Sequence, residues 1–288
     1  MKTRIETALA TAIARAEAGA PPRLGSAIRY AVFPGGARVR PRLCLAVAAA
    51  CGDDTPQLTD AVAASIEFLH CASLVHDDLP CFDDASLRRG KASVHRAFGE
   101  PLAVLVGDAL IILAFETLAR AGCQAPDRLA PLLSTVARAA GAPYGLVAGQ
   151  AWESEPTAPP LEEYHQAKTG SLFCAATMAG ALCAGRDPSP WRAVGERLGE
   201  AYQVADDLLD AVADPHEAGK PTLRDAALSR PSAVQKRGVS GALASLRLLV
   251  AEAVESVPQC PGADPLRELI LQMADRLVPE GLKQTAAA

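Results

Sequence analysis

Apolar residues recur at spacings of three and four along most of this 288-residue chain. Such spacing places them on one side of an α-helix, whereas a half-buried strand needs alternation with a period of two. No convincing run alternates in that way, and no linker is long enough to separate two domains. The pattern predicts one all-α domain over residues 1–288, with about ten to twelve helices. Glycine- and proline-rich segments separate the predicted helices at residues 20–22, 33–36, 52–56, 141–143, 157–160, 187–190 and 261–265.

Composition supports this fold class and excludes some functions. Half of the residues are hydrophobic, and alanine and leucine, both strong helix formers, are prominent among them. The net charge is −5 and no basic block stands out, which disfavours a nucleic-acid partner. The most apolar stretch, Leu102 to Ala119, is interrupted by Asp108 and Glu116. We therefore interpret it as a buried helix rather than a membrane span.

Cysteine usage and the N-terminal segment both predict a cytoplasmic protein. The chain has eight cysteines, and no pair shows CxxC spacing, which favours free, reduced thiols. Residues 1–19 are amphipathic and mixed in charge, and they lack the apolar core and cleavage site of a secretory signal.

Two acidic clusters each follow an apolar helical run. Asp206 and Asp210 are one helical turn apart, where like charges repel, and desolvation near an apolar region adds a further cost. Mg²⁺ removes both costs, because it binds carboxylate oxygens and completes its shell with water and substrate phosphate. Solvated helix ends would explain one cluster, but the repetition predicts two facing clusters that hold one diphosphate through Mg²⁺. The clusters are Asp77, Asp78, Asp83 and Asp84, and then Asp206, Asp207, Asp210 and Asp214.

Cationic residues accompany the first cluster. Arginine binds phosphate oxygens in bidentate fashion, and a glycine turn lets backbone N–H groups approach an anion. Taken singly, each of these cations is better explained as a surface charge, but together they complement a diphosphate. They are Arg88, Arg89 and Lys91 after the cluster, Arg38, Arg40 and Arg42 after a Gly-Gly turn, and Lys168 and Lys220 near predicted loops.

Seven segments resemble, in order, the motifs of the polyprenyl synthetases: FPGGARVRP, LVHDDLPCFDDASLRRGK, VLVGDALIILAFE, GQAWE, HQAKTG, YQVADDLLD and GKP. These trans-prenyltransferases make geranyl, farnesyl and geranylgeranyl diphosphate, and the likeness covers nearly the whole chain. The most detailed likeness is to bacterial geranylgeranyl diphosphate synthases of carotenoid pathways. The resemblance implies the isoprenoid synthase fold, in which helices surround a central apolar cavity, and a homodimer.

The resemblance also implies a role for individual residues. It assigns Mg²⁺, about three ions per active site and replaceable by Mn²⁺, to Asp77, Asp78, Asp83, Asp206, Asp207 and Asp210. It assigns the allylic diphosphate to Arg88, Lys168, Thr169, Gln203 and Lys220, where Thr169 and Gln203 also line the path of the carbocation. It assigns isopentenyl diphosphate to Arg40, His70 and Arg89.

The implied reaction joins isopentenyl diphosphate to dimethylallyl, geranyl or farnesyl diphosphate. Mg²⁺ and cationic side chains stabilise the departing diphosphate, and a closed apolar cavity keeps water from the allylic cation. The homoallylic double bond then attacks, and in this family the released diphosphate is thought to take the proton.

Four positions in three motifs depart from the family pattern. Ala37 stands where the family has lysine, and Arg38 and Arg42 are the nearby candidates to replace that charge. The GKxxGKD loop reads GKPTLRD, with Leu223 for glycine and Arg224 for lysine. Glu153 replaces the usual aspartate after the GQ pair. We expect these changes to affect affinity and lid closure rather than reaction class.

Product length depends on the floor of the cavity, which the family places before Asp77 on the same helix. Ala72 and Ser73 are small, and Phe68 and Leu69 lie one turn earlier. One turn is about 5.4 Å, roughly one isoprene unit, so the pattern predicts geranylgeranyl diphosphate. A farnesyl product, or a floor set by other helices, is the alternative.

Other classes fit the motifs less well. A terpene cyclase typically has an Asn/Ser/Glu motif in place of the second aspartate cluster, and head-to-head synthases have DxxxD motifs. A non-catalytic regulatory subunit is favoured slightly by Ala37 but opposed by the intact aspartates. A helical structural protein leaves both clusters unexplained. His76 and Cys81 beside the first cluster are interpreted as structural, since Mg²⁺ prefers oxygen.

Overall fold

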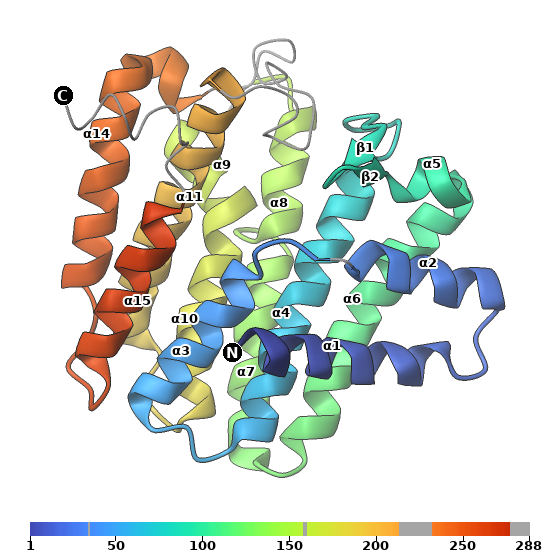
Figure 1. Ribbon diagram of the computed structural model, residues 1–288, viewed down its shortest axis with the longest axis horizontal. Helices are drawn as coiled ribbons and strands as arrows, with labels where there is room; N and C mark the ends of the chain where they lie inside the picture. Colours follow the sequence, from blue (N-terminus) through green and yellow to red (C-terminus); the bar gives the residue numbers. More distant parts are fainter. Residues whose placement is uncertain (34, 158–159, 213–231, 277–288) are drawn as a thin grey trace. The chain divides into compact units, whose positions relative to one another are not determined.

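The computed structural model describes residues 1–33, 35–157, 160–212 and 232–276. These residues are mostly helical (Figure 1), as the sequence predicts. Contacts divide the chain into two compact units, residues 1–136 with 179–186, and residues 137–178 with 187–288. Two of the three boundaries, at residues 136/137 and 178/179, fall inside helices. The single domain stays a prediction, and each unit is described by itself.

The first unit is built around two long helices, α4 and α6, which lie side by side (Figure 1). Phe68 of α4 and Leu110 and Leu118 of α6 are fully buried, and the Ser65 hydroxyl donates a hydrogen bond to the Ala114 carbonyl at 2.6 Å. The helices of this unit are α1 (Lys2–Glu17), α2 (Pro22–Val32), α3 (Val39–Cys51), α4 (Pro56–Asp77), α5 (Val94–Phe98), α6 (Glu100–Gly122) and most of α7 (Pro126–Ala140).

A short hairpin interrupts the helices of the first unit. Strand β1 (Leu87–Arg88) pairs antiparallel with β2 (Lys91–Ala92), and Arg88 lies opposite Lys91. The two linking residues, Arg89 and Gly90, have φ of 53° and 74°, which is the backbone of a type I′ turn. The sequence did not predict these strands, because two residues are too few to show a period of two.

The second unit is built around α11 and α14, which also lie side by side (Figure 1). Val204 and Leu208 of α11 pack with Leu246 and Leu249 of α14 in one buried cluster. The elements of this unit are α8 (Leu146–Ala151), η1 (Trp152–Ser154), α9 (Leu161–His165), the π-helix η2 (Gln166–Gly170), the first part of α10 (Ser171–Cys183), η3 (Ser189–Trp191), α11 (Arg192–Val212), α14 (Ala233–Glu255) and α15 (Ala263–Asp275).

Helix α6 is less buried than the sequence predicts. One side packs on α4, but Val104, Leu105 and Ile112 on the other side are exposed. By length and composition alone, α4 and α6 could each cross a membrane, a test that core helices of globular proteins also pass. The eight cysteines are all free thiols, as predicted, and five of them are buried.

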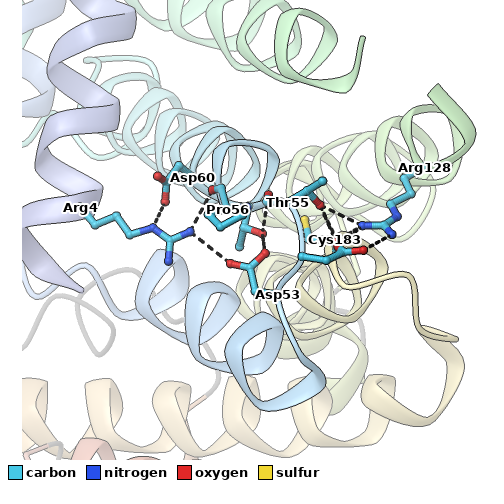
Figure 2. Close-up of polar contacts among 9 residues, drawn as sticks. Arg4, Asp53, Thr55, Pro56, Asp60, Arg128 and Cys183 are labelled. Carbon is cyan, nitrogen blue, oxygen red and sulfur yellow. Dashed lines mark hydrogen bonds and ion pairs between the residues drawn. The ribbon is translucent and has the colours of Figure 1, made fainter. Parts of the chain in front are cut away.

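The C-terminal end of α10 is capped by a side chain from α7 (Figure 2). The Arg128 guanidinium donates to the Cys183 carbonyl at 2.5 Å, to the Thr55 hydroxyl at 2.9 Å and to the Asp54 carboxylate at 2.5 and 2.8 Å. The Thr55 hydroxyl donates to the same carbonyl at 3.0 Å. Cationic groups stabilise helix C-termini because the last carbonyls have no partner within the helix.

We predict that Arg128→Met lowers the melting temperature by a few degrees, because the Cys183 carbonyl loses a charged donor worth about 1 kcal/mol or more. Thermal unfolding followed by circular dichroism is the measurement. Arg120→Met is the matched control, since among the described residues the ion pair of Arg120 is with exposed Glu116 on its own helix. Equal melting temperatures for the two variants would show that the cap contributes nothing.

Candidate functional site

The first aspartate cluster folds back on the end of α4. Asp77 is the last residue of that helix. The Asp83 N–H donates to the Asp77 carbonyl at 2.9 Å, and the Ala85 N–H donates to the Asp78 carbonyl at 3.1 Å. These bonds bring Asp83 beside Asp77, as the sequence predicts for ligands of one ion. Asp84 has a φ of 44°, and its carboxylate lies 3.6 Å from His95 Nε2.

Asp78 and Arg88 form a close ion pair at the start of the hairpin. Arg88 Nε donates to Asp78 at 3.0 and 3.2 Å, and a terminal nitrogen donates to it at 2.5 Å. Asp77 lies farther away, at 4.0 Å. Burial raises the pKa of the Asp78 carboxyl, and the Arg88 hydrogen bonds offset part of that rise. Asp78 therefore holds Arg88 in place, and its assignment as a Mg²⁺ ligand stays a prediction.

Basic side chains act on His70, which lies about two helical turns before Asp77. Burial and the charges of Arg40 and Arg89 hold the pKa of His70 well below its ordinary value. The imidazole is therefore neutral at pH 7 and can donate a hydrogen bond without adding charge. The three residues that the family resemblance assigns to isopentenyl diphosphate therefore lie close enough to interact, and the assignment itself stays a prediction.

Arg38 does not replace the missing lysine at position 37. Its side chain is fully buried and donates to Glu67 at 2.6 Å, to Glu6 at 2.9 Å and to the Val32 carbonyl at 2.9 Å. Burial opposes the charge, but these two carboxylates raise the pKa of Arg38 above its ordinary value. The guanidinium belongs to the framework beneath the glycine turn, so one of the two candidate replacements was wrong. Arg42 is half-buried.

The residues predicted to set product length line one part of α4. Phe68, Leu69 and Ala72 are buried and Ser73 is half-buried. The Ser73 hydroxyl donates to the His70 carbonyl at 2.8 Å. His76 contacts the Val104 carbonyl of α6 at 3.2 Å, which agrees with the structural role expected for it.

The second aspartate cluster ends α11 in the other unit. Asp206 is half-buried, whereas Asp207 and Asp210 are buried. Asp207 accepts hydrogen bonds on both oxygens, from the Gln203 amide at 3.0 Å and from the Ala233 N–H at 2.7 Å. Asp207 therefore anchors the start of α14. Lys220, Asp214, Leu223 and Arg224 lie outside the described residues.

Thr169 and Gln203, predicted to line the path of the carbocation, are in direct contact. The Thr169 hydroxyl donates to the Gln203 carbonyl oxygen at 2.6 Å, which extends the chain of hydrogen bonds that ends at Asp207. Thr169 lies in the π-helix η2, a local widening that is frequent at functional sites. A Cβ atom on Gly199 would lie 2.4 Å from Gly170 Cα, so this close approach of α11 and η2 requires glycine.

Lys168 has a partner that the residue assignments did not include. It forms an ion pair with Glu153 of η1, which also accepts hydrogen bonds from Tyr164 at 2.5 Å and from Gln150 at 3.2 Å. The family pattern marks Glu153 only as a departure from the usual aspartate. The sequence signal for Glu153 is the Gly-Gln pair that precedes it, because Gln150 of that pair donates a hydrogen bond to the Glu153 carboxylate.

Comparisons with known proteins agree with this arrangement of motifs. A family model described as polyprenyl synthetase matches residues 21–261. The chain belongs to the polyprenyl synthetase family. Two curated relatives are geranylgeranyl diphosphate synthases. That of Cereibacter sphaeroides is 53% identical, with 96% of each chain covered, and that of Rhodobacter capsulatus is 50% identical, with 96% of this chain and 95% of the relative covered.

A solved structure shares the fold of this polyprenyl synthetase. It is the geranyltransferase of Helicobacter pylori complexed with magnesium and isoprenyl diphosphate, which matches with a TM-score of 0.80 and 31% identity over 89% of each chain. The isoprenoid synthase fold predicted from the motifs is thereby confirmed.

We predict that Gly199→Ala destabilises the protein by about 1–3 kcal/mol, because the methyl group would overpack the crossing of α11 and η2. Denaturant unfolding is the measurement. Gly25→Ala is the matched control, since its Cβ would lie 3.3 Å from the flexible Glu17 side chain and alanine is the better helix former. A Gly199→Ala protein as stable as the control would refute the close crossing.

Proposed function

We propose that this chain condenses isopentenyl diphosphate with an allylic diphosphate, giving geranylgeranyl diphosphate and releasing diphosphate. The observation that carries the proposal is the grouping at the end of α4, where the turn holding Asp77 and Asp83 lies near arginines gathered around neutral His70. Acidic metal ligands beside phosphate-binding cations suit a reaction whose leaving group is a diphosphate. The sequence identity with geranylgeranyl diphosphate synthases supports the same reaction.

The donor set suits Mg²⁺. Asp77 and Asp83 of the first unit and Asp206 of the second offer carboxylate oxygens, the hard ligands that Mg²⁺ takes together with water and phosphate. We propose that both clusters bind the ions of one diphosphate, about three in number, with Mn²⁺ as a substitute. When bound, the ions supply positive charge to the departing diphosphate.

The cationic side chains divide between the two substrates. Arg88 would orient the allylic diphosphate, with Lys168 and Lys220 as its further ligands, and Arg40, Arg89 and His70 would hold isopentenyl diphosphate. Because His70 is neutral, it can donate a hydrogen bond to the diphosphate of this substrate without adding a further positive charge, which would hold the diphosphate more tightly. Thr169 and Gln203 present oxygen dipoles beside the expected path of the allylic cation.

Product length follows from the small side chain of Ala72. With Phe68 and Leu69 one turn deeper, the pocket would accept about one isoprene unit more than it would with a bulky residue at position 72. Farnesyl diphosphate synthase is the alternative, and a regulatory subunit of a heteromeric synthase is the alternative of another class.

We further propose a cytoplasmic homodimer. The exposed apolar side chains of α6, Val104, Leu105 and Ile112, run along one side of a helix whose other side is packed. A second copy of the chain would bury these side chains. Size-exclusion chromatography with light scattering measures the mass in solution, and the mass of a monomer would contradict this assembly.

We predict that Asp77→Ala and Asp206→Ala each lower turnover by at least about 100-fold, as expected when a group that stabilises the leaving charge is lost. The measurement is incorporation of labelled isopentenyl diphosphate at saturating Mg²⁺, with circular dichroism to verify folding. Asp264→Ala is the control, because Asp264 is exposed in the first turn of α15 and, within the described part of the chain, its ion pair is with Arg267. Near-normal turnover in either cluster variant would rule out the metal assignment.

We also predict that Ala72→Tyr shortens the product, because a phenol ring would occupy the space below the first cluster. Chromatography of the labelled products from each allylic starter gives the chain length. Ala49→Tyr places the same side chain at an exposed position of α3 and should leave the product unchanged. An unchanged product from Ala72→Tyr would place the floor elsewhere.

A further inference from the structure

Two glycines between α2 and α3, Gly35 and Gly36, are in close contact with arginine side chains, and we call these two residues the glycine turn. Beneath it, Arg38 occupies the space where a side chain on Gly35 would stand, since a Cβ there would lie 1.9 Å from Arg38 Cζ. Above it, a Cβ on Gly36 would lie 3.2 Å from Arg89 Nε. The turn therefore sits directly against the arginine that we assign to isopentenyl diphosphate.

Lys91 of β2 connects the hairpin to Phe33, which precedes the glycine turn in the chain. Its ammonium group donates to the Phe33 carbonyl at 2.8 Å and to the Tyr30 carbonyl at 3.3 Å. It also lies 3.9 Å from the centre of the Tyr30 ring, a cation–π distance. The Tyr30 hydroxyl returns a hydrogen bond to the Ala92 carbonyl at 2.8 Å. Three polar contacts and one ring contact thus join β2 to the end of α2.

These polar contacts matter because apolar packing there is incomplete. A pocket lies between α2, α4 and the hairpin, and its lining includes Tyr30, Cys71, Asp78, Arg88 and Lys91. Burial, followed by the charge of Arg89, lowers the pKa of Lys91. Lys91 is thus a second cation beside Arg89. The hydrogen bonds from its ammonium group to the two carbonyl groups offset part of the cost of burial and of repulsion by Arg89.

We propose that Lys91 is a positioning residue for isopentenyl diphosphate, acting through the Phe33 carbonyl to hold the glycine turn against Arg89. The inference rests on the proposed function. Lys91 is part of the same hairpin as Arg88, but Arg88 contacts Asp78 while Lys91 contacts the turn. Loss of Lys91 should therefore weaken the binding of isopentenyl diphosphate and leave the binding of the allylic diphosphate almost unaffected.

The test is steady-state kinetics of Lys91→Met with each substrate varied in turn. We expect the KM for isopentenyl diphosphate to rise about tenfold, while kcat and the KM for the allylic diphosphate change less than about twofold, because a uniform binding contribution is lost. Lys91→Arg should restore the KM to within about threefold, since a guanidinium also donates to two carbonyls. Tyr30→Phe, which removes only the hydrogen bond to Ala92, should shift the same KM in the same direction by a smaller factor.

Lys2→Met is the matched control, because Lys2 is an exposed lysine of the same unit. Equal rises in both KM values, or a fall in kcat with both KM values unchanged, would overturn the proposal. If Lys91→Met does not fold, an unchanged KM in Tyr30→Phe overturns it as well.

Calorimetric binding of isopentenyl diphosphate separates this inference from the proposed function. A wild-type protein that binds isopentenyl diphosphate without converting it would contradict the proposed reaction, while the ratio of dissociation constants between Lys91→Met and wild type would still decide the role of Lys91. A ratio near ten supports the positioning role, and a ratio of one refutes it.

Discussion

Negative charge gathered at the end of an apolar helix must be neutralised, and this requirement organises the first unit. Asp77, Asp78 and Asp83 follow the apolar core of α4, where burial already raises the pKa of Asp78. The protein supplies one cation to this group directly, by pairing Arg88 with Asp78. Divalent cations bound to the other two carboxylates would supply the rest, and a diphosphate would then balance the metal charge.

The second unit stabilises a buried carboxylate of its own cluster with hydrogen bonds. Asp207 accepts them from the Gln203 amide and from the Ala233 N–H, and it thereby connects α11 to the first residue of α14. Its neighbour Asp206 is left half-buried at the end of the same helix. The close approach of Gly199 to Gly170 then places Gln203, one turn further along, within hydrogen-bonding distance of Thr169.

Much of the fold could be predicted because helical periodicity is a local signal. The helices begin and end near the predicted glycine and proline segments, and the family motifs named the residues gathered around Asp77 and His70. The hairpin was missed because its strands have two residues each, and Lys91 was included only as one more cation.

Other features depend on contacts between residues distant in sequence. Nothing in the sequence near Arg38 indicates that Glu67 lies beside it. The sequence therefore could not distinguish Arg38, which forms a buried ion pair, from Arg40, which is assigned to a substrate. Helix α6 looked uniformly buried because hydropathy does not tell which side of an apolar helix has a partner, and Ile112 is exposed.

The most direct test of the proposed metal site is a crystal grown with Mn²⁺ and diphosphate, in which anomalous scattering locates the ions. We expect Mn²⁺ on Asp77 and Asp83 and also on Asp206, with oxygens of a single diphosphate completing the coordination of both sets. A diphosphate bound with ions at only one cluster, or with none, would contradict the central claim.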